Sequence, residues 1–171
     1  MRGINVGGHR KLPMKTLVPI FEGHGCQRVS TYIQSGNVVF EAKAAVAKRI
    51  PKLVAKSIAD DFGFDVPVVM RSAAELRETM NHNPFMTKAR DPKTLHVAFL
   101  SAKPLAAAIA ALDPERSPPD RLHVRGREVY LLLPNGVGRT KISNDYLEAR
   151  LGVGSTLRNW RTVSKLALML G

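Results

Sequence analysis

The order of hydrophobic patterns along residues 2–71 limits the folds open to this chain more than any other feature. A short strand-like run at 2–6 precedes an amphipathic segment that begins at Pro13, and a second such segment occupies 44–63. Between them the alternating runs at 28–34 and 38–42 flank the turn "SGN", and a last run covers 65–71. Alternation predicts strands and helical spacing predicts helices. The order β-α-β-β-α-β is that of a ferredoxin-like, split β-α-β unit.

The second half of the chain approximates the same order. We expect a helix at 72–80 that opens with a capping box of Ser72 and Glu75. The further expected elements are a strand at 95–101, a helix at 104–112, a hairpin at 121–133, and helices at 144–152 and 156–170. The sequence therefore predicts an α+β fold of two ferredoxin-like subdomains, 1–71 and 72–171, related by internal duplication and packed as one compact unit.

Charge is the unusual feature of the composition. The chain of 171 residues has 26 Lys and Arg against 14 Asp and Glu, a formal net charge of +12. Such a balance attracts polyanions, although an Arg-rich genome also yields basic proteins. No apolar run approaches the roughly 18 residues of a membrane span, and no cleavable signal region is present. We therefore expect a cytoplasmic protein with no membrane partner.

The sequence gives little support for cysteine chemistry or for a metal site. Cys26 is the only cysteine, so no intramolecular disulfide forms. The five histidines match no ligand spacing, and no cluster of carboxylates is evident. We expect no metal and no cofactor, and no residue is assigned a catalytic role.

A glycine pair stands between the first predicted strand and the first predicted helix. Backbone N–H groups at such a turn favour anions. The spacing matches neither a P-loop nor a dinucleotide fingerprint. Two interpretations stay open: a phosphate-binding turn, or a tight β-α turn that needs glycine for backbone reasons alone. The candidate ligand residues of this segment are Arg2, Asn5, Gly7, Gly8 and Lys11.

Polar side chains crowd the hairpin turn in "YIQSGNVVF". Asn and Ser in turns commonly bond their own backbone. The same side chains could instead present amides and a hydroxyl to a ligand. The candidate ligand residues here are Gln34, Ser35 and Asn37.

The last predicted helix combines an apolar stripe with a cationic side. Its apolar residues at helical spacing are Leu157, Trp160, Val163, Leu166 and Leu170. Trp160 is therefore expected in the core. Arg158, Thr162 and Lys165 fall at i, i+4 and i+7, beyond a start that Ser155 and Thr156 can cap. The candidate ligand residues are Arg158, Asn159 and Lys165, and we predict that this helix start shares one cleft with the Gly7-Gly8 turn.

Four blocks together resemble a known family. "RGINVGG", "TYIQSGNVVF", "NPF" and "TLRNWRTVSKL" are similar to the signature blocks of the bacterial domain-of-unknown-function family 1697, in the same order from Arg2 to about Leu168. The resemblance implies a two-subdomain α+β protein with ferredoxin-like sheets. No activity is established for the family, so it implies no catalytic residue. Members usually carry apolar residues before the first block, whereas Met1 directly precedes Arg2 here, which leaves a trimmed start or a short first strand.

Three functions stay open from the sequence. The first is binding of a phosphate-bearing anionic ligand, a nucleotide or nucleic acid, in a basic cleft. The second is an enzyme acting on a small phosphorylated or acidic substrate, which the missing carboxylate or His partner weakens. The third is a structural or interaction protein in which the polar blocks only lock turns. Fold alone does not choose among them, and the oligomeric state is not predicted.

Overall fold

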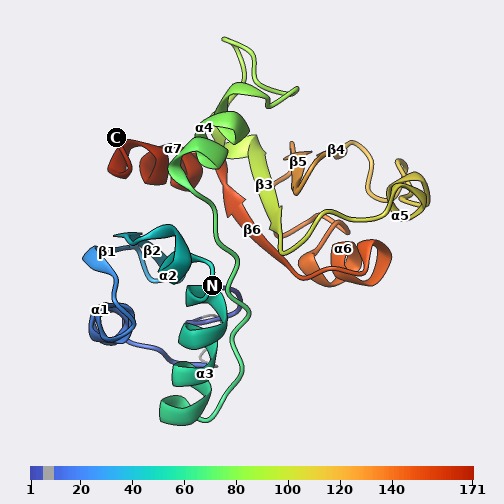
Figure 1. Ribbon diagram of the computed structural model, residues 1–171. Coiled ribbons are helices and arrows are strands. Elements are labelled where there is room, and N and C mark those ends of the chain that lie inside the picture. Colours follow the sequence, from blue (N-terminus) through green and yellow to red (C-terminus); the bar gives the residue numbers. More distant parts are fainter. Residues whose placement is uncertain (6–9) are drawn as a thin grey trace. The chain divides into compact units, whose positions relative to one another are not determined.

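The computed structural model describes residues 1–5 and 10–171 of a mixed α+β protein (Figure 1). The chain divides into two compact units, Met1–Met70 and Arg71–Gly171. Each unit has its own small antiparallel sheet and its own helices. The α+β fold class predicted from the sequence is thereby confirmed.

The first unit is a hairpin packed with helices. Its described elements are α1 (Met14–Gly23), β1 (Gln27–Tyr32), β2 (Asn37–Glu41), α2 (Ala44–Ala47) and α3 (Ile50–Phe62). β1 and β2 pair antiparallel, with Tyr32 opposite Asn37. The core consists mainly of apolar side chains from both longer helices, among them Leu17, Phe21, Ile50, Val54 and Ile58.

Two expectations for the first unit are corrected. The helix expected at 44–63 is two helices, α2 and α3. Pro51 lies in the first turn of α3, where a backbone N–H would have no partner within the helix, so proline is tolerated there. The described residues at 2–5 and 65–70 form no strand. The backbone at Gly3 and Asn5 has positive φ, and Pro67 lacks a donor, so neither run can continue a ladder. One backbone bond, from Arg2 N to Pro67 O (3.0 Å), joins the two runs.

The second unit contains a four-stranded antiparallel sheet in the order β4-β5-β3-β6. Its elements are α4 (Ala73–Asn81), the 3-10 turn η1 (Pro92–Thr94), β3 (Leu95–Leu100), α5 (Ala106–Ala110), β4 (Arg121–Arg125), β5 (Glu128–Leu132), α6 (Asn144–Leu151), β6 (Ser155–Asn159) and α7 (Trp160–Met169). From β3 to β6 the element order is β-α-β-β-α-β, as in a split β-α-β unit. The capping box of Ser72 and Glu75 opens α4 as predicted.

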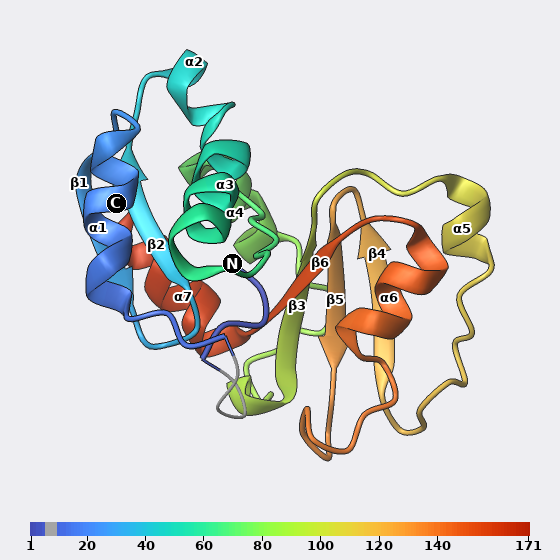
Figure 2. The ribbon, with the colours of Figure 1, turned by 90° about the horizontal axis from the view of Figure 1, so that it is seen from below.

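The sheet of the second unit is covered on both faces. α5 and α6 lie along one face (Figure 2), where Leu147 and Leu151 join Ala98 and Leu131 in a buried cluster. On the opposite face the Tyr130 hydroxyl of β5 donates to the backbone O of Thr79 in α4 (3.2 Å). β3 is buried along its whole length because it lies between two strands and two helical layers.

The last predicted helix is corrected at its start. Ser155–Asn159 is the strand β6, in which Leu157 lies opposite Ala98 of β3, and the helix begins only at Trp160. Asn159 caps it, because its side-chain O accepts from Thr162 N (2.8 Å). The alignment expected for Arg158, Thr162 and Lys165 on one helix face is therefore wrong. Pairing with a buried strand overrides a pattern that fits a helix equally well.

Trp160 lies in the core, as predicted, with a relative exposure of 4%. We expect Trp160→Ala to lower the free energy of unfolding by about 3–5 kcal/mol, because it removes a packed aromatic ring. Urea denaturation measures the loss. Arg161→Ala is the control at the exposed neighbour, with a change below about 0.5 kcal/mol. A Trp160 effect as small as the control would mean that the ring is not packed.

A buried histidine predicts that the second unit loses stability in acid. His96 of β3 is 6% exposed, and its Nδ1 has no hydrogen-bond partner among the described residues. Burial lowers the pKa of His96 below its usual value of 6.5, because the imidazolium loses hydration. Below that pH the unfolded chain binds a proton that the folded chain does not, so stability falls as pH falls.

We expect the free energy of unfolding to decline below about pH 6.5 with a slope of up to about 1.4 kcal/mol per pH unit from this group. His96→Leu should flatten that decline while the stability at pH 8 changes little. Urea denaturation at half-unit intervals from pH 8 to pH 5 measures both proteins. Equal slopes for the two would contradict a role for His96 in acid sensitivity.

Candidate functional site

The Asn5 side chain bonds both Leu12 and the hairpin turn between β1 and β2. Its side-chain Nδ2 donates to the backbone O of Leu12 (2.8 Å) and of Gln34 (2.9 Å), and its Oδ1 accepts from Leu12 N (2.8 Å). Its φ of 56° is one that Asn tolerates better than most residues. Asn5 therefore joins Leu12 to the hairpin turn.

The hairpin turn is closed by its own polar side chains. Asn37 is 6% exposed, and its Nδ2 donates to Tyr32 O (3.1 Å) and to Ser35 Oγ (2.9 Å). Gly36 has a φ of 75°, and a Cβ there would lie 2.8 Å from Ile4 Cδ1. The backbone O of Gly36 also accepts from Met1 N (3.0 Å). Glycine is required at this point by conformation and by space.

The remaining predicted ligand residues belong to both units of the chain. Gly7 and Gly8 lie outside the described residues, so the cleft predicted for their turn and Arg158 stays a prediction. Lys11 and Gln34 are exposed, and Arg2 is half-buried. In the second unit Lys165 is exposed on α7 and Asn159 caps that helix.

Arg158 lies on β6 and is largely withdrawn from solvent. Its Nη1 donates to Thr156 Oγ1 (2.7 Å) and to the backbone O of Leu157 (2.8 Å). Burial lowers the pKa of Arg158 to about 10. The guanidinium thus makes contacts with its own strand, although it stays charged at neutral pH.

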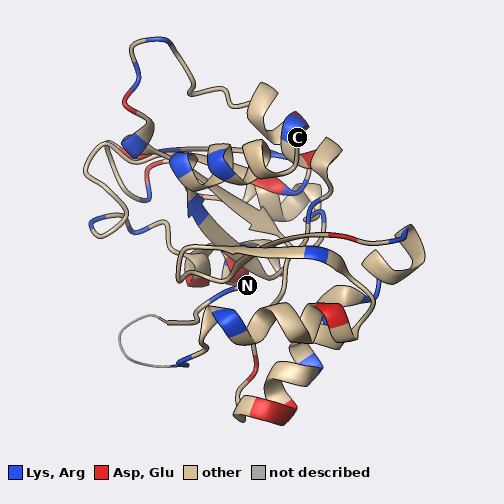
Figure 3. Ribbon diagram, turned by 90° about the vertical axis from the view of Figure 1, so that its left-hand side faces the viewer, with Lys and Arg blue, Asp and Glu red and all other residues tan. Residues whose placement is uncertain are grey.

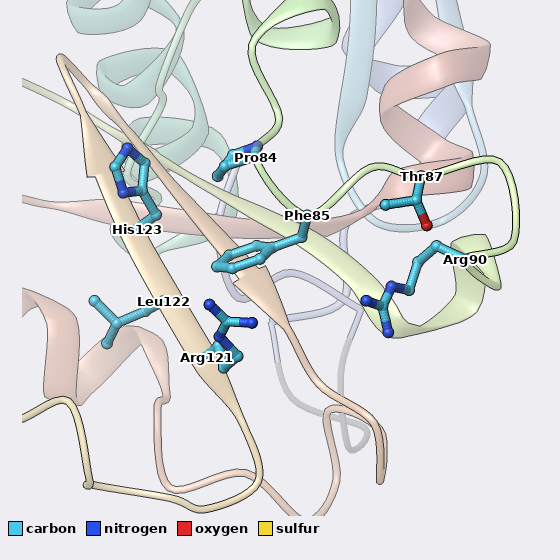
Figure 4. Close-up of a pocket in the computed structure, with 7 residues that line it drawn as sticks. All are labelled: Pro84, Phe85, Thr87, Arg90, Arg121, Leu122 and His123. Carbon is cyan, nitrogen blue, oxygen red and sulfur yellow. The ribbon is translucent and has the colours of Figure 1, made fainter.

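A cavity that the sequence analysis did not predict opens at the outer strand of the second unit (Figure 4). It measures about 370 Å³ and lies between β4 and the loop that joins α4 to β3. Its lining residues are Pro84, Phe85, Thr87, Arg90, Arg121, Leu122 and His123. We call it the β4 pocket.

Local geometry fixes the walls of the β4 pocket. Asn83 accepts a hydrogen bond from Phe85 N through its Oδ1 (3.0 Å), which turns the chain at Pro84. The Arg121 guanidinium carbon lies 5.3 Å from the centre of the Phe85 ring, a cation–π contact. Figure 4 shows the guanidinium groups of Arg90 and Arg121 extending toward the space beside this ring.

The β4 pocket is cationic. Arg90 and Arg121 line it, no Asp or Glu does, and neither arginine forms an ion pair with any described residue. By contrast, Arg71 is paired with Glu128 (2.7 Å) and Arg127 with Glu75. Figure 3 shows further basic residues on the loop that follows α4 and along α7. The pocket therefore offers uncompensated positive charge to an anion.

Two sequence signals could have found the β4 pocket. The "NPF" block places Asn83, Pro84 and Phe85 together, and "RLHVR" alternates cationic and apolar residues with the period of a strand. Neither signal shows that the two segments meet.

The residues 1–5 and 10–171 contain no cluster of three His, Cys, Asp or Glu that could hold a metal ion. Within the same ranges no helix has the length and apolar character needed to cross a membrane.

The fold and the pocket define a two-unit α+β protein with an open cationic site on its second unit. The family described as "Protein of unknown function (DUF1697)" matches residues 1–130, and the chain belongs to that family. The match ends before the "TLRNWRTVSKL" block. The solved structure of the conserved bacterial protein SP0830 from Streptococcus pneumoniae is similar in fold, with a TM-score of 0.70 and 22% identity over 99% of this chain and 95% of that one. No curated protein matches the chain.

The hydrogen bonds of Asn5 predict a loss of stability on truncation. We expect Asn5→Ala to lower the free energy of unfolding of the first unit by about 1–3 kcal/mol, because three bonds are lost and Leu12 N and O lose their partner. Gln34→Ala is the matched control, since only the backbone O of Gln34 accepts from Asn5. Urea denaturation followed by circular dichroism compares them. Equal losses would contradict a stabilising role for the Asn5 side chain.

Proposed function

We propose that this protein binds a phosphate-bearing anionic ligand, with the phosphate in the β4 pocket. The observation that carries the proposal is that Arg90 and Arg121, both without an ion-pair partner among the described residues, line one cavity that no carboxylate lines. Both arginines are exposed, and two guanidinium groups at one concavity without a carboxylate partner attract an external anion.

The chemistry of the lining suits phosphate. A guanidinium presents several N–H donors in a plane and binds phosphate oxygens in pairs. The Thr87 hydroxyl and the His123 imidazole add donors on either side of the arginines. Contact with Phe85 restricts Arg121, so that less side-chain freedom is lost on binding. The volume of about 370 Å³ lies at the lower end of the range for small-molecule sites.

The lining supports binding more than catalysis. His123 is the one side chain in the β4 pocket of a type that commonly acts as a general acid or base. No carboxylate or second histidine lies in the pocket to orient it, and no cysteine or serine lines the cavity as a nucleophile. A phosphorylated metabolite or a nucleotide is therefore proposed as a bound ligand and not as a substrate.

The pocket predicts which arginines matter for anion binding. We expect Arg90→Gln with Arg121→Gln to weaken binding of pyrophosphate and of uridine monophosphate by about tenfold or more, because charge-assisted bonds are lost. Isothermal titration calorimetry at fixed ionic strength measures the dissociation constants. Thermal unfolding of each variant confirms that it is folded.

Two further variants locate the site. Arg139→Gln with Arg161→Gln removes the same charge from exposed positions elsewhere in the second unit and should change affinity less than about twofold. Lys11→Gln with Lys165→Gln tests the cleft expected from the sequence. Equal losses in all three pairs would mean diffuse attraction and no pocket. A loss confined to the Lys11 and Lys165 pair would place the site away from β4.

A further inference from the structure

The positive charge of the β4 pocket continues along the strand beyond the cavity. Arg121, His123 and Arg125 occupy alternate positions of β4 and are exposed, while Leu122 and Val124 between them are half-buried against the core. Alternate residues of a strand point to the same face and lie roughly 7 Å apart. Together with Arg90 these three residues form a row that we call the β4 track.

The β4 track keeps its charge. Arg125 lies opposite Glu128 in the register of β4 and β5, but the Glu128 carboxylate bonds Arg71 Nε at 2.7 Å. The Arg71 side chain is 6% exposed, so this ion pair belongs to the interior of the unit. No ion pair joins Arg121, His123 or Arg125 to a described residue. Asp120, which precedes Arg121 in the chain, is buried and accepts from Ser117 Oγ (2.7 Å), so it too is bonded to another side chain.

β4 also forms one edge of its sheet. β4 is an outer strand of its sheet, and in the described part of the chain β5 is its only strand partner. A row of side chains on one outer strand contacts a narrow, extended ligand better than a broad one.

We propose that the β4 track binds a single-stranded nucleic acid, with one phosphate in the β4 pocket and the following phosphates at His123 and Arg125. This inference rests on the proposed function and names its ligand class. Successive phosphates of an extended single strand repeat at a distance comparable to that between alternate residues of a β-strand. Electrostatic tracking of the backbone with stacking of bases is the common mode of single-strand binding.

Stacking has a candidate partner in Arg121. Its guanidinium carbon lies 5.3 Å from the centre of the Phe85 ring, and the residue is exposed. Bases stack on guanidinium planes as well as on aromatic rings, so the exposed guanidinium is suited to receive a base. An acidic peptide would use the charges but not this plane, and it would leave most of the cavity of about 370 Å³ empty.

Length dependence tests the proposal. We measure fluorescence anisotropy of labelled oligouridylates of two to eight nucleotides, with uridine monophosphate as competitor. Affinity should rise by about tenfold or more from the dinucleotide to a plateau, because each further phosphate contact adds counterion release. Arg125→Gln should weaken binding of the octamer about three- to tenfold and reduce the salt slope by about 1, with little effect on the mononucleotide. Arg139→Gln is the matched control and should change neither quantity.

The outcomes separate the two proposals. If the mononucleotide binds the pocket but affinity does not rise with length and Arg125→Gln has no effect, the β4 track is overturned and the pocket stands. If Arg90→Gln with Arg121→Gln affects neither mononucleotide nor octamer, both proposals fail. Competition by hexaglutamate as strong as that by unlabelled octauridylate would overturn the nucleic-acid assignment in favour of an acidic peptide, and equal affinity for a duplex of the same length would overturn the single-strand assignment.

Discussion

The pairing of β3 with strands on both of its edges determines which side chains of β4 line the β4 pocket. β3 is buried over all six residues, so its register with β5 and β6 cannot shift by one residue without moving apolar side chains to the wrong face. β5 then sets the register of β4. Through these two pairings a buried strand decides that Arg121 and His123 share a face with Tyr130, next to the loop that carries Phe85.

The distribution of charge carries more information than its total. Arg71 donates to Glu128, to Leu100 O (2.9 Å) and to Arg127 O (2.8 Å), and its guanidinium lies over the Phe99 ring. Arg71 therefore stabilises the fold: the Glu128 carboxylate compensates its charge, and burial shields it from solvent. The arginines of the β4 pocket lack any such carboxylate among the described residues. A net charge of +12 therefore comprises cations that stabilise the fold and others that stay available to an anion.

The polar blocks of the first unit act mainly on their own backbone. The Asn5 amide bonds the backbone of Leu12 and Gln34, the Asn37 amide closes the β1–β2 turn, and Gly36 allows Ile4 to approach that turn. Side-chain bonds of this kind satisfy buried backbone groups that a loop would otherwise leave unpaired. The blocks that carry the family resemblance thus include residues with clear structural tasks, and a ligand role for Lys11 or Gln34 stays a prediction.

The sequence predicts features that depend on residues close together in the chain, and it does not predict which distant segments pair. The α+β class, the capping box at Ser72 and the burial of Trp160 follow from nearest-neighbour patterns, because caps and amphipathic stripes depend on residues a few positions apart. The sequence predicts a helix where the structure has the strand β6, because the spacing of Leu157 and Trp160 fits a helix as well as a strand. Only the pairing with β3 selects the strand. The β4 pocket was missed for the same reason. Its two walls are about 35 residues apart in the chain, from Phe85 to Arg121, and only the tertiary structure decides that the sheet edge and the loop enclose one space.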